Sequence, residues 1–379
     1  MNFGEQDERF MQRALALAAE TVRLASPNPC VGCMIVKDGA VVGEGAHRYD
    51  ERDHAEIVAL KMAGEAAQGA TVYVTLEPCS HQGRTGPCAD ALVAARVGRV
   101  VVATLDPNPL VSGGGIARLR AAGIRVETGL LQQEARALND GFAQFIRTKR
   151  PFVTLKAALS ADGRLAPADS ARVAGEPFWL TGAEARAEVQ RMRHASDAIL
   201  TGIGTVLADD PALTDRTELP RRRGLLRVVL DAELRLPLES QLVRSVADDV
   251  LVFGADGVEA ECAAVLEAAG VMVAHVPMVG GRLDLRAVLA ELGRREMLSV
   301  LLEAGSRLNG SFVREDRVDR MVFFHSRTEL GSDALPFAEG VALAEIEQRL
   351  TLVSRRSFGS DVCVAGYLHD AWECADALG

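Results

Sequence analysis

A histidine, a glutamate and two cysteines near the start of the chain have the residue types and the spacing of a catalytic zinc site. One residue separates His54 from Glu56, and eight residues separate Cys79 from Cys88. One imidazole and two thiolates are the ligand set of a catalytic zinc ion, which keeps its fourth position for water, whereas a structural zinc ion more often has four protein ligands. We therefore predict that His54, Cys79 and Cys88 bind zinc.

Glu56 in this pattern is predicted to move protons rather than to bind the metal. Zinc lowers the pKa of a bound water toward neutrality. The carboxylate of Glu56 can take a proton from this water and deliver it to a leaving amine. His-x-Glu followed by Pro-Cys is the signature of zinc-dependent nucleobase deaminases, although their two cysteines usually have two residues between them. The reaction that we expect is hydrolytic deamination.

Other histidines and cysteines nearby have less specific interpretations. Cys30 and Cys33 form a C-x-x-C pattern, but they lie in an expected strand, so packing is favoured over metal or redox chemistry. A solvated loop position is favoured for His81 over a role as fourth ligand. For His47, lining the site and packing stay equally open. Cys88 is expected at a helix N-terminus, which lowers the pKa of a thiol.

The order of apolar patterns in the first 150 residues predicts a three-layer α/β domain around these residues. Alternating and short apolar runs indicate strands over 31–36, 40–42, 70–76 and 99–103. Helical spacing indicates helices over 10–24, 54–62 and 87–96, and the alternation of elements continues over 116–121, 125–127 and 132–137.

A second series of elements follows a short basic, proline-containing junction over 148–151. Strands are predicted over 152–157, 198–201, 227–230, 250–253, 271–275 and 298–303, with helices over 183–193, 258–268 and 285–292. A chain of 379 residues exceeds one ordinary domain. We predict two domains, over residues 1–149 and 150–379.

Composition narrows the class of function. The chain is 48% hydrophobic and 25% charged, with a formal net charge of −10. An acidic chain whose basic runs are as short as Arg221–Arg223 is not expected to bind nucleic acid. We find no apolar run near the ~20 residues that span a membrane. Seven cysteines, an odd number, and an acidic first segment argue against a secreted disulfide framework, so a cytoplasmic protein with a small-molecule substrate is expected.

Motifs in both halves resemble one family, the bifunctional deaminase–reductases of riboflavin biosynthesis. The first half contains PNPCVGCMIVKDG, HAE and YVTLEPCSHQGRTGPC, and the second contains LKAALSADG, DAILTGIGTVLADDPALTDR and LLEAGSRLNGS. The resemblance implies a cytidine-deaminase-like domain followed by a dihydrofolate-reductase-like domain, both α/β. It implies zinc-dependent deamination of 2,5-diamino-6-(5-phosphoribosylamino)pyrimidin-4-one, then reduction of the ribosyl group to ribityl with NADPH. A homo-oligomer is also implied.

The resemblance assigns roles to individual residues. In the first domain it assigns the zinc ligands and Glu56 as above, with Asn28 in contact with the pyrimidine. The expected contacts of the nicotinamide cofactor are Ala158, Trp179, Thr205, Asp209, Gly305, Ser306, Arg307, Leu308, Asn309, Gly310 and Ser311. The expected contacts of the ribosyl phosphate substrate are Lys156, Arg193, Leu213, Arg216 and Glu303. Arginine binds phosphate in a bidentate fashion, and a lysine in an apolar strand is costly unless paired.

Two glycine-containing segments of the second half, over 202–205 and 305–311, are of the kind that presents backbone N–H groups to phosphate at a helix N-terminus. Each signal alone is weak and favours a simple tight turn, but the two together suit a dinucleotide. For either segment, glycine serving only a tight turn stays open. Other positions depart from the family pattern: Ala161 replaces a usual Leu, Pro177 and Ala232 replace frequent Ser residues, and the loop over 164–176 is long.

These departures keep open a second hypothesis, a monofunctional zinc deaminase with a non-catalytic, nucleotide-binding C-terminal domain. A third hypothesis, a nucleic-acid-editing deaminase, conflicts with the acidic charge.

Overall fold

The computed structural model describes residues 3–81, 86–168 and 178–373 and contains two compact units. The first unit holds the chain up to Lys149, and the second begins at Arg150. Two short segments that the sequence prediction assigns to the second domain, Pro220–Arg222 and Trp372 with Glu373, group with the first unit. Side-chain contacts explain this difference, because the Trp372 indole donates to Asp140 Oδ1 at 3.0 Å.

The first unit is built on a five-stranded mixed sheet with the order β2-β1-β3-β4-β5. β1 is antiparallel to β2 and β3, whereas β3, β4 and β5 run parallel. The carboxyl ends of β3 and β4 therefore meet at one edge of the sheet, where the segment of Cys79 begins. The strands are β1 (Gly32–Lys37), β2 (Ala40–Ala46), β3 (Thr71–Leu76), β4 (Arg99–Thr104) and β5 (Arg125–Thr128).

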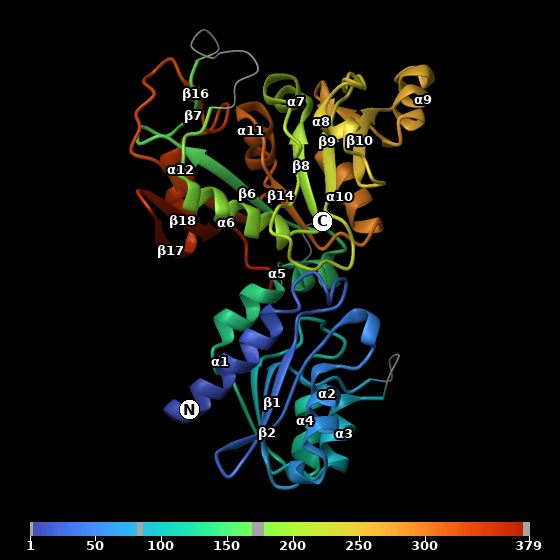
Figure 1. Cartoon of the computed structure of the whole chain (residues 1–379), viewed down its shortest axis with the longest axis vertical. Coiled ribbons are helices and arrows are strands. Elements are labelled where there is room, and N and C mark those ends of the chain that lie inside the picture. Colours follow the sequence, from blue (N-terminus) through green and yellow to red (C-terminus); the bar gives the residue numbers. More distant parts are fainter. Residues whose placement is uncertain (1–2, 82–85, 169–177, 374–379) are drawn as a thin grey trace. The chain divides into compact units, whose positions relative to one another are not determined.

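Helices cover both faces of this sheet (Figure 1). α1 (Glu5–Ala19) and α5 (Gln132–Thr148) pack on one face, and α2 (Ala55–Ala63), α3 (Cys88–Ala94) and α4 (Gly114–Ala121) pack on the other. Short 3₁₀ turns cover Tyr49–Glu51 and Gly64–Ala67. This arrangement is the predicted three-layer fold.

Glycines in β2 bring α2 unusually close to the sheet. A Cβ atom on Gly43 would lie 2.3 Å from the Ala59 carbonyl oxygen, and one on Gly45 would lie 2.4 Å from that of Ala55. Any larger residue would push away the helix whose first turn carries Glu56. The glycines of β2 therefore allow the close approach of α2 that places Glu56 beside the sheet.

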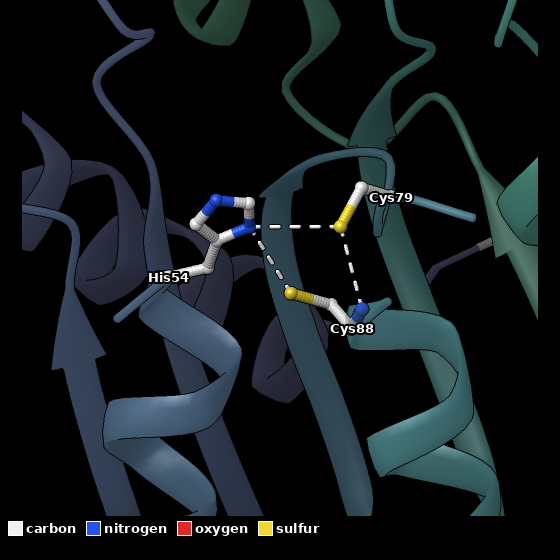
Figure 2. Close-up of side chains that lie close together, drawn as sticks. All are labelled: His54, Cys79 and Cys88. Carbon is white, nitrogen blue, oxygen red and sulfur yellow. Dashed lines mark hydrogen bonds between the residues drawn. The ribbon is translucent and has the colours of Figure 1, made fainter. Parts of the chain in front are cut away.

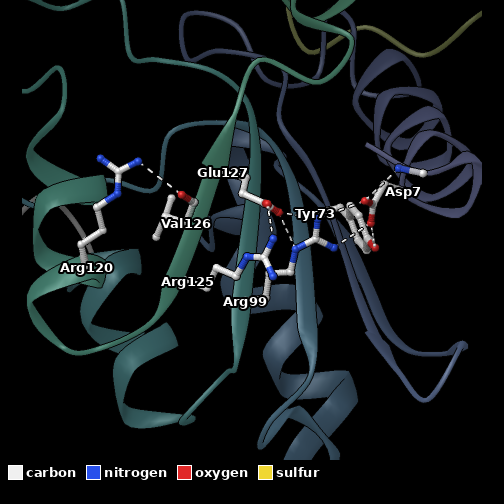
Figure 3. Close-up of polar contacts among 8 residues, drawn as sticks. Asp7, Tyr73, Arg99, Arg120, Arg125, Val126 and Glu127 are labelled. Atoms are coloured by element: carbon white, nitrogen blue, oxygen red, sulfur yellow. Dashed lines mark hydrogen bonds and ion pairs between the residues drawn. The ribbon is translucent and has the colours of Figure 1, made fainter. Parts of the chain in front are cut away.

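A polar network fixes α1 to the opposite face of the same sheet (Figure 3). Arg99 on β4 donates to both Asp7 oxygens, at 2.7 and 3.0 Å, and its Nε donates to Glu127 on β5 at 2.6 Å. The hydroxyl of Tyr73 also donates to Asp7, at 2.6 Å. The hydrogen bonds from Arg99 hold the pKa of Asp7 at about 2. The helix predicted over 10–24 begins earlier, at Glu5, because three acidic residues in its first turn stabilise that end.

The second unit contains a nine-stranded sheet with the order β11-β10-β9-β8-β14-β6-β15-β18-β17. The strands from β11 to β15 run parallel, and the last two are antiparallel additions. The strands of this unit are β6 (Phe152–Leu159), β7 (Arg164–Ala166), β8 (Ala198–Gly202), β9 (Leu226–Leu230), β10 (Val250–Ala255), β11 (Met272–Val276), β12 (Met278–Val279), β13 (Arg282–Leu283), β14 (Ser299–Leu302), β15 (Arg320–His325), β16 (Leu335–Pro336), β17 (Thr351–Phe358) and β18 (Asp361–Tyr367).

Two apolar cores lie on opposite faces of this sheet, because alternate residues such as Ile199 and Leu200 belong to different cores. The face lined by Leu200 is covered by α10 (Leu285–Arg294), α11 (Ser306–Arg314) and α12 (Leu343–Arg349). The other is covered by α6 (Ala183–His194), α7 (Ile203–Asp209), α8 (Gln241–Arg244) and α9 (Ala260–Ala268). Within the described ranges, no helix is long and apolar enough to cross a bilayer.

Candidate active sites

The predicted metal ligands meet where two helices begin beside the end of β3 (Figure 2). His54 is the N-cap of α2, Cys88 is the first residue of α3, and Cys79 lies three residues beyond β3. The Nδ1 atom of His54 is 3.2 Å from Cys88 Sγ and 3.6 Å from Cys79 Sγ. Chain segments 25 and 34 residues from His54 therefore supply the two sulfurs.

The donor set fits a zinc ion. The three ligand atoms all lie within 4.8 Å of one another. Tetrahedral zinc with usual bond lengths separates a nitrogen ligand from a sulfur ligand by about 3.6 Å, close to the two separations above. Among the described residues, no fourth side chain joins this group, and His81 lies exposed outside it. The favoured interpretation of His81 as a loop residue agrees with this position.

The two thiols differ in acidity when they share a proton without a metal. A hydrogen bond from the Cys88 thiol, together with those from His54 and the Cys88 backbone, lowers the pKa of Cys79. The same pairing with Cys79 raises the pKa of Cys88. This direction is opposite to the one predicted for Cys88 from its place at a helix N-terminus, because without a metal the two thiols share one proton. The first N–H of α3 points at Cys79 instead, 3.3 Å from its sulfur.

Glu56 lies beside the ligands but is almost fully buried. Its exposed fraction is 3%. Burial raises the pKa of Glu56 to about 7. A carboxyl group with a pKa near neutrality can both accept and donate a proton at ordinary pH, which is what a proton shuttle requires. Position and acidity both support the predicted role.

The partly buried Asn28 pairs with the buried His47, whose ring centre lies 5.3 Å from that of His54. The Nδ1 atom of His47 lies 2.8 Å from the carbonyl oxygen of Asp53, so this nitrogen must carry the hydrogen. Nε2 of His47 is then the acceptor for the Asn28 amide, 3.0 Å away. Burial lowers the pKa of His47, which keeps the ring neutral. The amide oxygen of Asn28 is thereby turned away from His47, which is almost fully buried.

Sequence reasoning missed Glu77, which stands two residues before Cys79. One of its oxygens accepts the backbone N–H groups of Asp106 at 3.2 Å and Gly113 at 2.9 Å. The other accepts those of Gly115 at 2.9 Å and Ile116 at 3.2 Å. The carboxylate therefore closes both ends of the loop between β4 and α4. Only its place in the quoted motif TLEPC could have drawn attention to it.

In the second unit, three of the expected substrate residues form one ion cluster. Arg193 on α6 donates to both oxygens of Glu303, at 2.8 and 3.1 Å, and Lys156 Nζ lies 3.4 Å from Glu303 Oε2. Burial raises the pKa of Glu303, but Lys156 and Arg193 outweigh it and lower that pKa to about 2. β6 lies between β14 and β15, so an edge position for Lys156 is excluded.

The other two expected substrate residues lie on the loop after α7. Leu213 is buried and has a left-handed backbone with φ of 51°. Arg216 is exposed, and its backbone N–H donates to Gln190 Oε1 at 3.0 Å. Arg193 donates to the Thr214 carbonyl oxygen at 3.1 Å, which joins this loop to the ion cluster.

Both predicted phosphate-binding turns are helix beginnings rather than loops. α7 starts at Ile203 and α11 at Ser306, with Gly202 and Gly305 as N-caps. Gly310 does not serve a turn, because a Cβ there would lie 2.4 Å from the Glu339 carbonyl oxygen. Close packing of backbone segments, invisible in the local pattern, explains this glycine.

The expected cofactor contacts lie on several elements of the second unit, and some of them meet where α7 and α11 begin. Thr205 faces Gly305, where an added Cβ would lie 3.8 Å from its hydroxyl, so the two helix starts adjoin. The Asn309 amide is buried and donates to the Phe337 carbonyl oxygen at 3.0 Å, whereas Arg307 is exposed. Ala158 lies on β6, Leu308 is partly buried, and Ser311 accepts a hydrogen bond from Arg282 Nη1 at 2.7 Å. Asp209 is exposed at the end of α7. Trp179 lies beneath the Arg186 guanidinium. Pro177 lies outside the described residues.

Two family models match the chain, one for each unit. The model described as cytidine and deoxycytidylate deaminase zinc-binding region matches residues 4–104. The model described as RibD C-terminal domain matches residues 151–364. The first contains the predicted metal ligands, and the second contains the Glu303 cluster.

Curated and solved proteins resemble the chain over both units. The riboflavin biosynthesis protein RibD of Escherichia coli (strain K12) is 42% identical over 375 residues, covering 95% of this chain and 98% of that protein. The structure of Acinetobacter baumannii RibD, form 1, has a TM-score of 0.81 and 40% identity, covering 96% and 99% of the two chains. A Thermotoga maritima structure, described as a diaminohydroxyphosphoribosylaminopyrimidine deaminase/5-amino-6-(5-phosphoribosylamino)uracil reductase, has a TM-score of 0.79 and 32% identity, covering 96% and 98%.

Proposed function

Because the chain belongs to the RibD family and is a bifunctional deaminase and reductase of riboflavin biosynthesis, we propose that the residues assembled above carry its two reactions. Similarity over both units disfavours the monofunctional alternative. The observation that carries the proposal is the convergence of His54, Cys79 and Cys88 beside the buried Glu56.

In the deaminase unit, His54, Cys79 and Cys88 would hold zinc, which when bound activates water for attack on the pyrimidine ring. Glu56 takes a proton from the attacking water and delivers it to the ring amine, which leaves as ammonia. Asn28, oriented by His47, directs its amide oxygen at a donor group of the pyrimidine. The ring carbon exchanges its exocyclic C–N bond for a C=O bond, and the second proton of the water ends on the adjacent ring nitrogen.

In the reductase unit, we propose that NADPH lies over the starts of α7 and α11, where Thr205 faces Gly305. Helix N-termini present backbone N–H groups to phosphate. The hydride comes from the cofactor, and the protein places the sugar to receive it. Lys156 and Glu303 would bind the ribosyl group, and Arg216 would bind its phosphate.

The domains are proposed to span residues 1–149 and 150–379, with Pro220–Arg222 and Trp372 packed on the first. We propose a cytoplasmic location, since free thiols such as Cys79 and Cys88 stay reduced there. We also propose a homo-oligomer. Exposed Leu352 and Val353 on the edge strand β17 support this, and sedimentation velocity tests it.

One preparation of the full chain tests both reactions. Ammonia release from the diaminopyrimidine ribosylamine phosphate measures deamination, and NADPH oxidation with the deaminated product measures reduction. We expect both activities. Absence of NADPH oxidation at every concentration of the deaminated product would eliminate the assignment of the second unit, and absence of ammonia release from zinc-loaded protein would eliminate that of the first.

A further inference from the structure

We propose that His194 and Asp215 are positioning residues that hold the loop over 213–217 so that Arg216 meets the phosphate of the reductase substrate. This inference rests on the proposed function of Arg216. Neither residue has a role in the predictions from sequence. A contact joins the end of a helix to a loop residue 21 positions further along the chain.

The His194–Asp215 contact is short and shielded from solvent. Nδ1 of His194, the last residue of α6, lies 2.9 Å from Asp215 Oδ2, and both side chains are 9% exposed. A carboxylate oxygen only accepts, so Nδ1 carries the hydrogen. A hydrogen bond to a charged acceptor in such a place contributes more than a solvated one.

The second oxygen of Asp215 shapes the loop on the far side of Arg216. Asp215 Oδ1 accepts the backbone N–H of Thr217 at 2.9 Å and its hydroxyl at 2.7 Å. The carboxylate of Asp215, the residue before Arg216, thus holds Thr217, the residue after it. His194 fixes that carboxylate to α6.

Two further contacts tie the same loop to the same helix. Gln190 accepts the backbone N–H of Arg216, and Arg193 donates to the carbonyl oxygen of Thr214. Arg193 also binds Glu303, so α6 connects the loop directly to the proposed sugar site. The backbone of Arg216 is therefore fixed relative to Glu303.

The side chain of Arg216 differs from those of its neighbours. It is exposed, and across the described ranges no ion pair or hydrogen bond of its guanidinium is found. Arg193, in contrast, already binds a carboxylate. A fixed backbone with an uncommitted guanidinium is the arrangement that bidentate phosphate binding needs.

The test measures phosphate recognition in the full chain. We expect His194→Ala and Asp215→Asn each to raise the KM for the deaminated, phosphorylated intermediate about tenfold, with kcat within about twofold, because only binding is lost. The inhibition constant of ribose 5-phosphate, used as a probe of the phosphate site, rises by the same factor. His275→Ala, a histidine of the same unit outside this loop, is the matched control and changes neither constant.

Coupling to Arg216 separates positioning from general stability. Arg216→Ala raises the same two constants, and adding His194→Ala to it causes no further rise, because His194 acts through Arg216. Unchanged constants in both His194→Ala and Asp215→Asn, beside an affected Arg216→Ala, would overturn this inference alone. Unchanged constants in Arg216→Ala would instead remove Arg216 from the proposed function. Additive effects in the double variant would also overturn the inference.

Discussion

The carboxylate of Glu77 accepts the backbone N–H of Gly115 at 2.9 Å, across 38 residues of sequence. This bond joins the first turn of α4 to the segment that carries Cys79. Gly115 permits the approach, because a Cβ there would lie 1.9 Å from the Pro78 carbonyl oxygen. Cys79 is held separately, through its own contacts with Cys88 and Ala89. Glu77 therefore supports the loop beside the metal site rather than the ligand itself.

Replacing Glu77 by Gln is expected to destabilise the deaminase unit without removing the metal. The Gln side chain has one oxygen, which can accept one pair of the N–H groups, and one NH2 group, which faces the other pair. The two backbone N–H donors of that other pair therefore lose their acceptor. Buried unpaired donors cost about 1–3 kcal/mol each, and we expect a loss of about 2–4 kcal/mol. Chemical denaturation followed by circular dichroism measures it.

The exposed Glu65 in the same unit provides the matched control for Glu77. Glu65→Gln is expected to change stability by less than about 0.5 kcal/mol. Equal stability of the two variants would contradict the role that we give to Glu77.

Glu56→Gln is expected to keep zinc and lose deamination by at least ~100-fold, the usual contribution of a general acid–base. The amide has the size of the carboxyl group but cannot shuttle a proton. Metal analysis and ammonia release measure the two effects, and NADPH oxidation by the same preparation reports that the chain is folded. Near-normal ammonia release would exclude Glu56 from proton transfer.

Removal of zinc with a chelator is expected to abolish deamination and to leave NADPH oxidation intact. The metal-ligating group found among the described residues lies wholly in the first unit. Adding zinc back should restore ammonia release. A parallel loss of both activities would show that the metal also serves the reductase.

The stability contributed by Glu303 is expected to depend on pH. Its pKa is about 2 in the folded chain, whereas a glutamate in an unfolded chain has a pKa of about 4.3. The folded state therefore favours the ionised form, and the contribution is complete above about pH 5 and declines as the pH falls toward 2.

Urea unfolding of the native chain and of Glu303→Gln, between about pH 7 and about pH 3.5, tests this sign. The difference in unfolding free energy between the two proteins should shrink on acidification. A difference that widens would show that Lys156 and Arg193 do not stabilise the carboxylate.

The sequence alone predicted three metal ligands, Glu56 beside them and the order of elements, and the structure brings the three ligand atoms within 4.8 Å of one another. Spacing identifies His54, Cys79 and Cys88 because metal chemistry limits the residue types, and apolar periodicity identifies buried strands such as β3 and β4. Resemblance between motifs added the expected reductase residues. Three of them, Lys156, Arg193 and Glu303, do lie together in the structure.

Only the tertiary structure decided which polar groups pair. Glu77 with Gly115, Asn28 with His47 and His194 with Asp215 are joined across 38, 19 and 21 residues. Gly310 likewise follows from the approach of a distant backbone segment at Glu339. Periodicity reports which face of an element is buried, but not what that face meets. Hydrogen bonds depend on separations of a few tenths of an ångström, which are set only when the helices pack on their sheets.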